Sequence, residues 1–188
     1  NGGISWRGVN GCFRKIFRGD SFYNDFSGIK SYFFINDRIY ALGSNIDSDN
    51  KKYHVQTNLY QKALYRSETD RKGKLIKKID LTNTPTYIDS KEITSFPVPE
   101  KELAEDNAHR LIDPQGNGYF IPAGQKVFVA RKNQISRTSN YNKHFDHDGD
   151  FATAWLDHGV ECKDAKYSYV IMPYCNKAKL AKFSAGDF

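Results

Sequence analysis

The spacing of apolar residues along this chain predicts β-strands far more often than helices. The clearest example is KSYFFINDRIYALGSNI (30–46), in which two apolar runs flank the dipeptide Asn36-Asp37. Asn and Asp tolerate the positive φ angles that a tight hairpin turn requires. We therefore expect antiparallel strands over 29–35 and 38–44, paired about this dipeptide.

The first of these strands is apolar on both faces, because side chains alternate between the two faces of a strand. Tyr32 and Phe34 point to one face. Phe33 and Ile35 point to the other, so the strand must be covered on both sides. Two later runs have the same character: KVFVAR (126–131) and KYSYVIM (166–172). Such strands predict stacked sheets, as a sandwich with extra layers or one that packs on a neighbour outside this sequence.

Two further segments extend the β pattern. In HVQTNLYQ (54–61), Val55, Thr57 and Leu59 alternate with polar residues, which predicts a strand with one solvated face. The segment LIDPQGNGYFIP (111–122) predicts a second hairpin, because Pro, Gly and Asn at its centre supply the turn.

Two short stretches favour a helical conformation. Residues 100–106, which follow Pro97 and Pro99, suit one or two helical turns, and residues 177–184 suit a helix near the end of the chain. The predicted fold class is all-β: an antiparallel multi-sheet sandwich fragment with at most one or two short helices, forming a single domain over 1–188.

Composition supports a packed domain with a basic surface. The 188 residues are 39% hydrophobic, too many for a disordered chain, and 14% aromatic, which suits strand cores and also carbohydrate surfaces. The net charge of +6 attracts anionic partners, but charge alone does not choose among nucleic acid, anionic lipid and a sulfated polysaccharide.

A lysine-rich stretch carries much of this charge. We interpret residues 62–78 as a solvated hairpin extension or loop, with a polyanion contact as the less favoured alternative. Its basic residues are Lys62, Arg66, Arg71, Lys72, Lys74, Lys77 and Lys78.

Neither the cysteines nor the apolar runs identify the cellular compartment of the protein. Cys12, Cys162 and Cys175 are odd in number, so this is no disulfide scaffold. The sequence has neither an apolar run of about 20 residues nor a signal-peptide pattern. Because it opens at Asn1 without a methionine, we expect a processed or excised piece of a longer protein.

One acidic cluster resembles part of a calcium loop, since alternating carboxylates suit a hard cation. Its members are Asp146, His147, Asp148, Gly149 and Asp150. The closing position holds Asp157 in place of the usual Glu, and we favour a polar connection over a metal site. Its neighbours Asn140, Tyr141, Asn142 and His144 have the character of a loop.

Other candidate chemistry is incomplete. His144, His147, His158 and Cys162 lack the spacing of a zinc site. Serine-hydrolase and phosphate-loop motifs are absent. Trp6-Arg7 and Trp155 could stack on sugar rings, although we expect Trp155 to be buried within its strand. We therefore assign no catalytic and no metal-binding residue, and the chain requires no cofactor.

Several segments together resemble the family eight polysaccharide lyases, which include the chondroitin and hyaluronan lyases, with the strongest likeness to chondroitin sulfate ABC lyases. The stretch 62–84 departs from the family and looks like an insertion. The similar segments are Gly2-Gly3-Ile4-Ser5, KSYFFINDRIYALGSNI, HVQTNLYQ, LIDPQGNGYFIP and FATAWLDHGVECKDAKYSYVIMP.

This resemblance implies a place within a larger enzyme. The family joins an α-helical toroid, a central β-supersandwich and a C-terminal β-domain, and this chain is similar to most of the latter half of the supersandwich. The family cleaves by β-elimination: a base removes the C5 proton of a uronic acid and the 4-linked oxygen leaves. The family's catalytic residues lie outside the part that this chain matches.

Our leading hypothesis is a β-domain of a secreted or periplasmic glycosaminoglycan lyase, acting as scaffold and cleft wall. Its expected partners are an anionic polysaccharide and the missing toroid and C-terminal domain, with neither nucleic acid nor membrane. The alternatives are a non-catalytic carbohydrate- or polyanion-binding module and a structural β-domain without a ligand.

Overall fold

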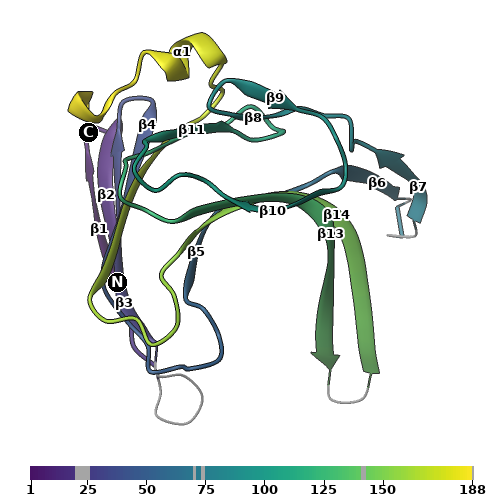
Figure 1. Ribbon diagram of the computed structural model, residues 1–188, viewed down its shortest axis with the longest axis horizontal. Helices are drawn as coiled ribbons and strands as arrows, with labels where there is room; N and C mark the ends of the chain where they lie inside the picture. Colours follow the sequence, from purple (N-terminus) through teal and green to yellow (C-terminus); the bar gives the residue numbers. More distant parts are fainter. Residues whose placement is uncertain (20–25, 70, 73–74, 141–142, 188) are drawn as a thin grey trace.

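Two antiparallel sheets form the body of the protein in a computed structural model, which describes residues 1–19, 26–69, 71–72, 75–140 and 143–187 (Figure 1). The larger sheet has nine strands in the order β1-β2-β3-β4-β15-β12-β11-β8-β9, and the smaller has four in the order β10-β13-β14-β5. A separate two-stranded sheet pairs β6 with β7. The predicted all-β, multi-sheet class is confirmed.

The strands of the three sheets have the following bounds. The nine-stranded sheet comprises β1 (Gly2–Trp6), β2 (Asn10–Phe17), β3 (Ser27–Ile35), β4 (Arg38–Asp47), β8 (Thr86–Ile88), β9 (Lys91–Ile93), β11 (His109–Ile112), β12 (Gly118–Ile121) and β15 (Ala165–Met172). The other strands are β5 (Gln56–Ala63), β6 (Tyr65–Thr69), β7 (Leu75–Asp80), β10 (Val98–Glu102), β13 (Val127–Asn140) and β14 (Lys143–Asp157).

The main core lies between the two large sheets, and a second, smaller core lies on the opposite face of the nine-stranded sheet. The second core forms under α1 (Lys177–Ala181), which covers that face together with the 3₁₀ turn η1 (Ala185–Asp187) (Figure 1). Its buried members are Ile112, Phe120, Val170, Met172, Cys175, Leu180 and Phe183. Strands β12 and β15 are therefore covered on both faces, as the two-faced pattern of 166–172 predicts.

The hairpin about Asn36-Asp37 forms as predicted. Strands β3 and β4 pair antiparallel with Ile35 opposite Arg38, and Asn36 has a φ of 55°. The predicted cover of β3 is only partly present, because Tyr32 packs on the main core whereas three residues near the turn stay 37–43% exposed. These residues are Phe33, Phe34 and Ile35.

The hairpin over 111–122 and the strands over 54–61 and 126–131 are also confirmed, with shifted ends. The helix expected over 100–106 is wrong. This segment begins inside β10, which pairs with the edge of β13, and then turns. A helix this short is marginal by itself, whereas sheet pairing satisfies the backbone polar groups of both strands. The helix expected over 177–184 is shorter than predicted.

Buried Arg131 fastens the segment before β10 to the four-stranded sheet. Its guanidinium donates to the carbonyl of Ser95 at 3.0 Å, to the carbonyl of Thr84 at 3.0 Å and to the Thr86 hydroxyl at 2.6 Å. It also donates to the carbonyl of Thr82. These neutral acceptors compensate the burial of a charge that is only 2% exposed. The connection from β7 to β10 is thereby held against β13.

Candidate functional site

A polar groove lies on the outer face of the four-stranded sheet. Alternation along β14 turns Ala154 and Leu156 into the core and leaves Thr153 and Trp155 on the outer face. The groove has a volume of about 520 Å³, and we call it the amide groove because four of its residues carry side-chain amides. Its lining residues are Gln56, Asn58, Gln61, Glu100, Lys132, Gln134, Thr153 and Trp155.

Trp155 forms the aromatic wall of the amide groove, and the expectation that it is buried is wrong. Its side chain is partly exposed. Phe128, opposite it on β13, stacks on its ring at 5.5 Å between centroids with an interplanar angle of 11°. Phe128 does not line the groove. It therefore supports the indole from the neighbouring strand, while Trp155 lines the groove.

The charges of the amide groove balance. The ammonium of Lys132 lies 3.1 Å from the Glu100 carboxylate and 5.9 Å from the centroid of the Trp155 ring. The Gln61 amide donates to Gln134 across the intervening strand β14. Within the described residues, the side-chain amides of Gln56 and Asn58 make no hydrogen bond. The groove thus offers polar hydrogen-bonding groups with no net charge.

The other tryptophan lies in the other sheet. Trp6 ends β1 beside the turn to β2, is 62% exposed, and carries the Arg7 guanidinium 5.4 Å from its ring centroid. The two sugar-stacking candidates, Trp6-Arg7 and Trp155, are therefore not brought together.

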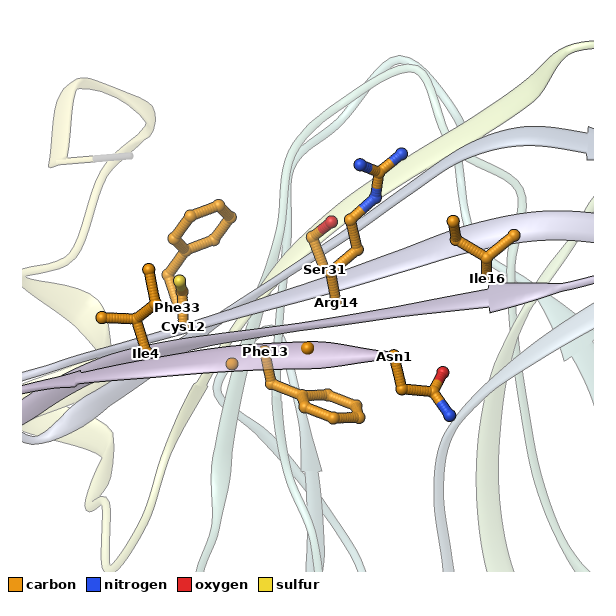
Figure 2. A pocket seen from close by; sticks show the side chains of 10 residues that line it. Asn1, Ile4, Cys12, Phe13, Arg14, Ile16, Ser31 and Phe33 are labelled. Atoms are coloured by element: carbon orange, nitrogen blue, oxygen red, sulfur yellow. The ribbon is translucent and has the colours of Figure 1, made fainter.

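A second hollow, of about 530 Å³, lies on strands β1–β3 and is apolar (Figure 2). Ile4, Cys12 and Phe33 occupy facing positions on three neighbouring strands and stand on one side of the sheet. Phe13 points to the opposite side (Figure 2). This hollow presents apolar carbon and offers few groups for chemistry.

The acidic cluster is part of a strand and not the loop that both interpretations assumed. Residues 146–150 lie in β14, with Asp148 opposite Ile135 and Asp150 opposite Asn133. Gly149 leaves room for the Tyr65 ring, since a Cβ there would lie 2.6 Å from it. Among the described side chains, no three His, Cys, Asp or Glu residues gather as metal ligands.

Two neighbours of this cluster that were expected to lie in a loop also lie in strands. Asn140 ends β13 and His144 lies in β14, whereas Tyr141 and Asn142 fall outside the described residues.

The zinc candidates that the structure describes also serve packing. His158 Nε2 lies 2.9 Å from the Thr57 hydroxyl, and burial lowers the pKa of this histidine. Cys162 is buried as a free thiol. The side chains of His144 and His147 lie outside the described residues.

One histidine that the sequence reading overlooked is tightly held. His109 Nδ1 lies 2.8 Å from the Asp89 carboxylate, and Nε2 lies 2.9 Å from the carbonyl oxygen of Ala104. The bond with Asp89 raises the pKa of His109. No sequence motif predicts this pair, because its members are 20 residues apart in sequence.

The lysine-rich stretch forms the predicted hairpin extension, with β6 and β7 as its strands. Lys72 and Lys77 are exposed on it, whereas Lys74 and the side chain of Lys78 lie outside the described residues. Lys62 differs from the rest of the group: it lies in β5, donates to Gln115 at 2.8 Å and is 3.5 Å from buried Asp113. Its charge therefore serves the fold.

None of the helices in the described part of the chain is long and apolar enough to span a membrane.

Known proteins that are similar to this chain in sequence include two chondroitin sulfate ABC lyases. The chain is 29% identical to the chondroitin sulfate ABC endolyase of Proteus vulgaris, over 88% of this chain and 14% of that protein. It is 30% identical to the chondroitin sulfate ABC exolyase of the same species, over 86% of this chain and 14% of that protein. The chain therefore spans only a small part of the length of these relatives.

Solved structures show the same fold at lower identity. A chondroitinase AC lyase matches with a TM-score of 0.72 and 22% identity, over 98% of this chain and 24% of that one. A Paenibacillus xanthan lyase matches with a TM-score of 0.71 and 21% identity, over 95% of this chain and 16% of that one.

A family model, polysaccharide lyase family 8, super-sandwich domain, matches residues 1–184. Because this match covers nearly the whole sequence, the chain belongs to polysaccharide lyase family 8, as part of its super-sandwich domain.

Proposed function

We propose that this chain is the β-sandwich part of a lyase that cleaves a uronic-acid-containing glycosaminoglycan, such as chondroitin sulfate, dermatan or hyaluronan, by β-elimination. Its role is that of a scaffold and of one wall of the polysaccharide cleft. The whole enzyme is secreted or periplasmic, where such polymers are met.

The family match over residues 1–184 carries this proposal. The two Proteus vulgaris relatives are named for chondroitin sulfate ABC cleavage. The net charge of +6 agrees with an anionic polymer as substrate, because a basic surface raises the local concentration of polyanions.

The chemistry of β-elimination explains why the chain needs other domains. The uronate carboxylate must be neutralised so that C5 becomes acidic, and a base must be positioned at the C5 proton and an acid at the leaving oxygen. We assign none of these groups to residues 1–188, so catalysis requires residues from the rest of the enzyme.

The test compares the complete gene product with residues 1–188 alone. Cleavage of chondroitin sulfate is followed by the absorbance of the unsaturated uronate, and circular dichroism with thermal melting shows that the short chain is folded. We expect turnover by the complete protein and none by the folded short chain. Turnover by residues 1–188 would place the catalytic groups in this chain, and an inactive complete protein would remove the lyase assignment.

A second candidate function, a carbohydrate-binding module without catalysis, is favoured by the amide groove. Trp155 supplies an aromatic surface there, and the amides around it supply donors and acceptors. The same experiment separates the two candidates, because a binding module produces no unsaturated uronate in any form of the protein.

A further inference from the structure

We propose that the amide groove is a saccharide-binding site that holds pyranose rings through one aromatic wall and side-chain amides, and not through charge. The proposal rests on the proposed function for the identity of the polymer alone. The binding chemistry is read from the groove itself.

The aromatic wall is fixed in place before any ligand arrives. Phe128 stacks on Trp155 from β13, and both residues stand on paired strands at the centre of the four-stranded sheet. A ring held by its neighbours loses little conformational freedom on binding. Phe128 covers part of the indole, and the Lys132 ammonium lies 5.9 Å from the ring centroid. The remaining aromatic surface is of the kind that packs against the C–H groups of a sugar ring.

The amides supply groups that match sugar hydroxyls. Each side-chain amide carries a donor NH₂ and an acceptor oxygen, and a hydroxyl can both donate and accept. Asn58 lies directly opposite Trp155 in the ladder, and Gln56 lies two residues before it on β5. Both are exposed and, within the described residues, make no side-chain hydrogen bond, so both remain available for a ligand.

The charge balance decides the class of ligand. The groove lining carries one lysine and one glutamate, which pair with each other at 3.1 Å. A nucleic acid or a densely sulfated chain would need unpaired cations to neutralise its phosphates or sulfates. A site without net charge suits the hydroxyl and acetamido groups of a sugar ring.

The volume is also suitable. About 520 Å³ lies within the usual range for small-ligand sites, and it accommodates a short stretch of saccharide. Its lining residues stand on paired strands of one sheet, and Thr153 among them is buried.

The test is calorimetric titration of the 188-residue chain with an unsulfated chondroitin hexasaccharide. We expect a Kd below about 1 mM. The ligand keeps its uronate carboxylates, but the paired Lys132 and Glu100 leave no net charge in the groove to attract them, so raising NaCl from about 50 to about 500 mM should change the Kd less than about twofold. No detectable binding, or a Kd that rises steeply with salt, would overturn the proposal.

The variants localise the site. Trp155→Ala should weaken binding at least about tenfold, whereas Trp6→Ala, which removes the chain's other exposed tryptophan from the larger sheet, should leave the Kd unchanged. The reverse pattern, or equal binding by Trp155→Ala and the unaltered chain, contradicts the site. Circular dichroism checks the folding of each variant.

If Trp155→Ala does not fold, the double variant Gln56→Ala with Asn58→Ala tests whether the amide groove binds the ligand. Both side chains are exposed, so their loss should not affect the core. At least about a threefold loss of affinity supports the groove, and an unchanged Kd rejects it. These outcomes do not depend on cleavage, so the proposal can fail while the lyase assignment stands, or the reverse.

Discussion

The imidazole of His109 faces a hydrogen-bond acceptor with each of its nitrogens, and the stronger partner is the Asp89 carboxylate, 2.8 Å from Nδ1. The carbonyl of Ala104 accepts from Nε2 at 2.9 Å. Both bonds can form together only when both nitrogens carry a proton, that is, in the imidazolium. The histidine is buried, whereas the Asp89 side chain is 45% exposed, so solvent reaches this pair from the carboxylate side.

The stability of the protein should therefore depend on pH through His109. The bond with Asp89 raises the folded-state pKa of this histidine above its ordinary value of 6.5. The stabilisation is fully present below pH 6.5 and is lost as the pH rises through the folded-state pKa, because the folded state holds the proton more tightly. His109→Gln should lower the free energy of unfolding at pH 6 by about 1–3 kcal/mol, and by less at high pH.

Urea unfolding at a series of pH values between about 5 and 9 measures this effect as the difference between the two proteins. Asp89→Asn provides a second measurement, because it removes the negative charge and keeps the shape. A difference that stays constant with pH, or grows as the pH rises, would show that His109 is not held as the imidazolium.

Asp113 organises the turn between β11 and β12. Its carboxylate accepts from the backbone N–H groups of Gln115 at 2.8 Å and Asn117 at 3.0 Å, and from the Tyr119 hydroxyl at 3.1 Å. The side chain is fully buried, with Lys62 at 3.5 Å. Asp113→Ala leaves these donors without a partner and should cost about 3 kcal/mol.

Thermal unfolding gives the measurement for Asp113→Ala, with an expected fall in Tm of several degrees. Asp113→Asn is the matched control, because its remaining carbonyl oxygen keeps part of the network. It should lose less than Asp113→Ala. Equal melting of Asp113→Ala and the unaltered protein would mean that the turn forms without this carboxylate.

The absence of a side chain at Gly43 makes room for Tyr167. The two residues are paired across β4 and β15, and a Cβ at position 43 would overlap the tyrosine ring. That ring is 4% exposed and stacks on Tyr169 and His158 at 5.8 Å, so it has little freedom to move. Gly43→Ala should destabilise the protein by about 1–3 kcal/mol.

Gly2→Ala is the control for Gly43→Ala, since a Cβ at Gly2 meets nothing within 4 Å. Both proteins are compared by the midpoint of urea unfolding. Similar midpoints for the two variants would show that the Tyr167 ring moves aside without cost.

Much of this architecture could be predicted because strands leave a local pattern. The dipeptide Asn36-Asp37 between two apolar runs was enough to place a hairpin, and the predicted second strand of this hairpin, 38–44, contains Gly43. Alternation also predicted that Thr57 and Leu59 share the buried face of β5, which they do. These inferences need only neighbouring residues.

The orientation of β14 could not be predicted in this way. Alternation shows that Trp155 and Ala154 point to opposite faces but does not say which face meets the core. The core received the small side chains because tyrosines such as Tyr60 and Tyr119, 5.2 Å apart between ring centroids, fill that space from other strands. A single sequence does not show that complementarity. The same limit explains β10, whose partner β13 is distant in sequence.

The β6–β7 hairpin should contribute little to catalysis. It forms a two-stranded sheet apart from the two large ones, and Lys72 and Lys77 are exposed on it. Exposed lysines on such an extension keep the strands soluble and discourage edge pairing. In the complete enzyme, replacing Lys72, Lys74, Lys77 and Lys78 with Ser should change kcat/KM less than about twofold. A tenfold fall, equal to about 1.4 kcal/mol of transition-state stabilisation, in a variant with unchanged Tm would instead show that the hairpin touches the substrate.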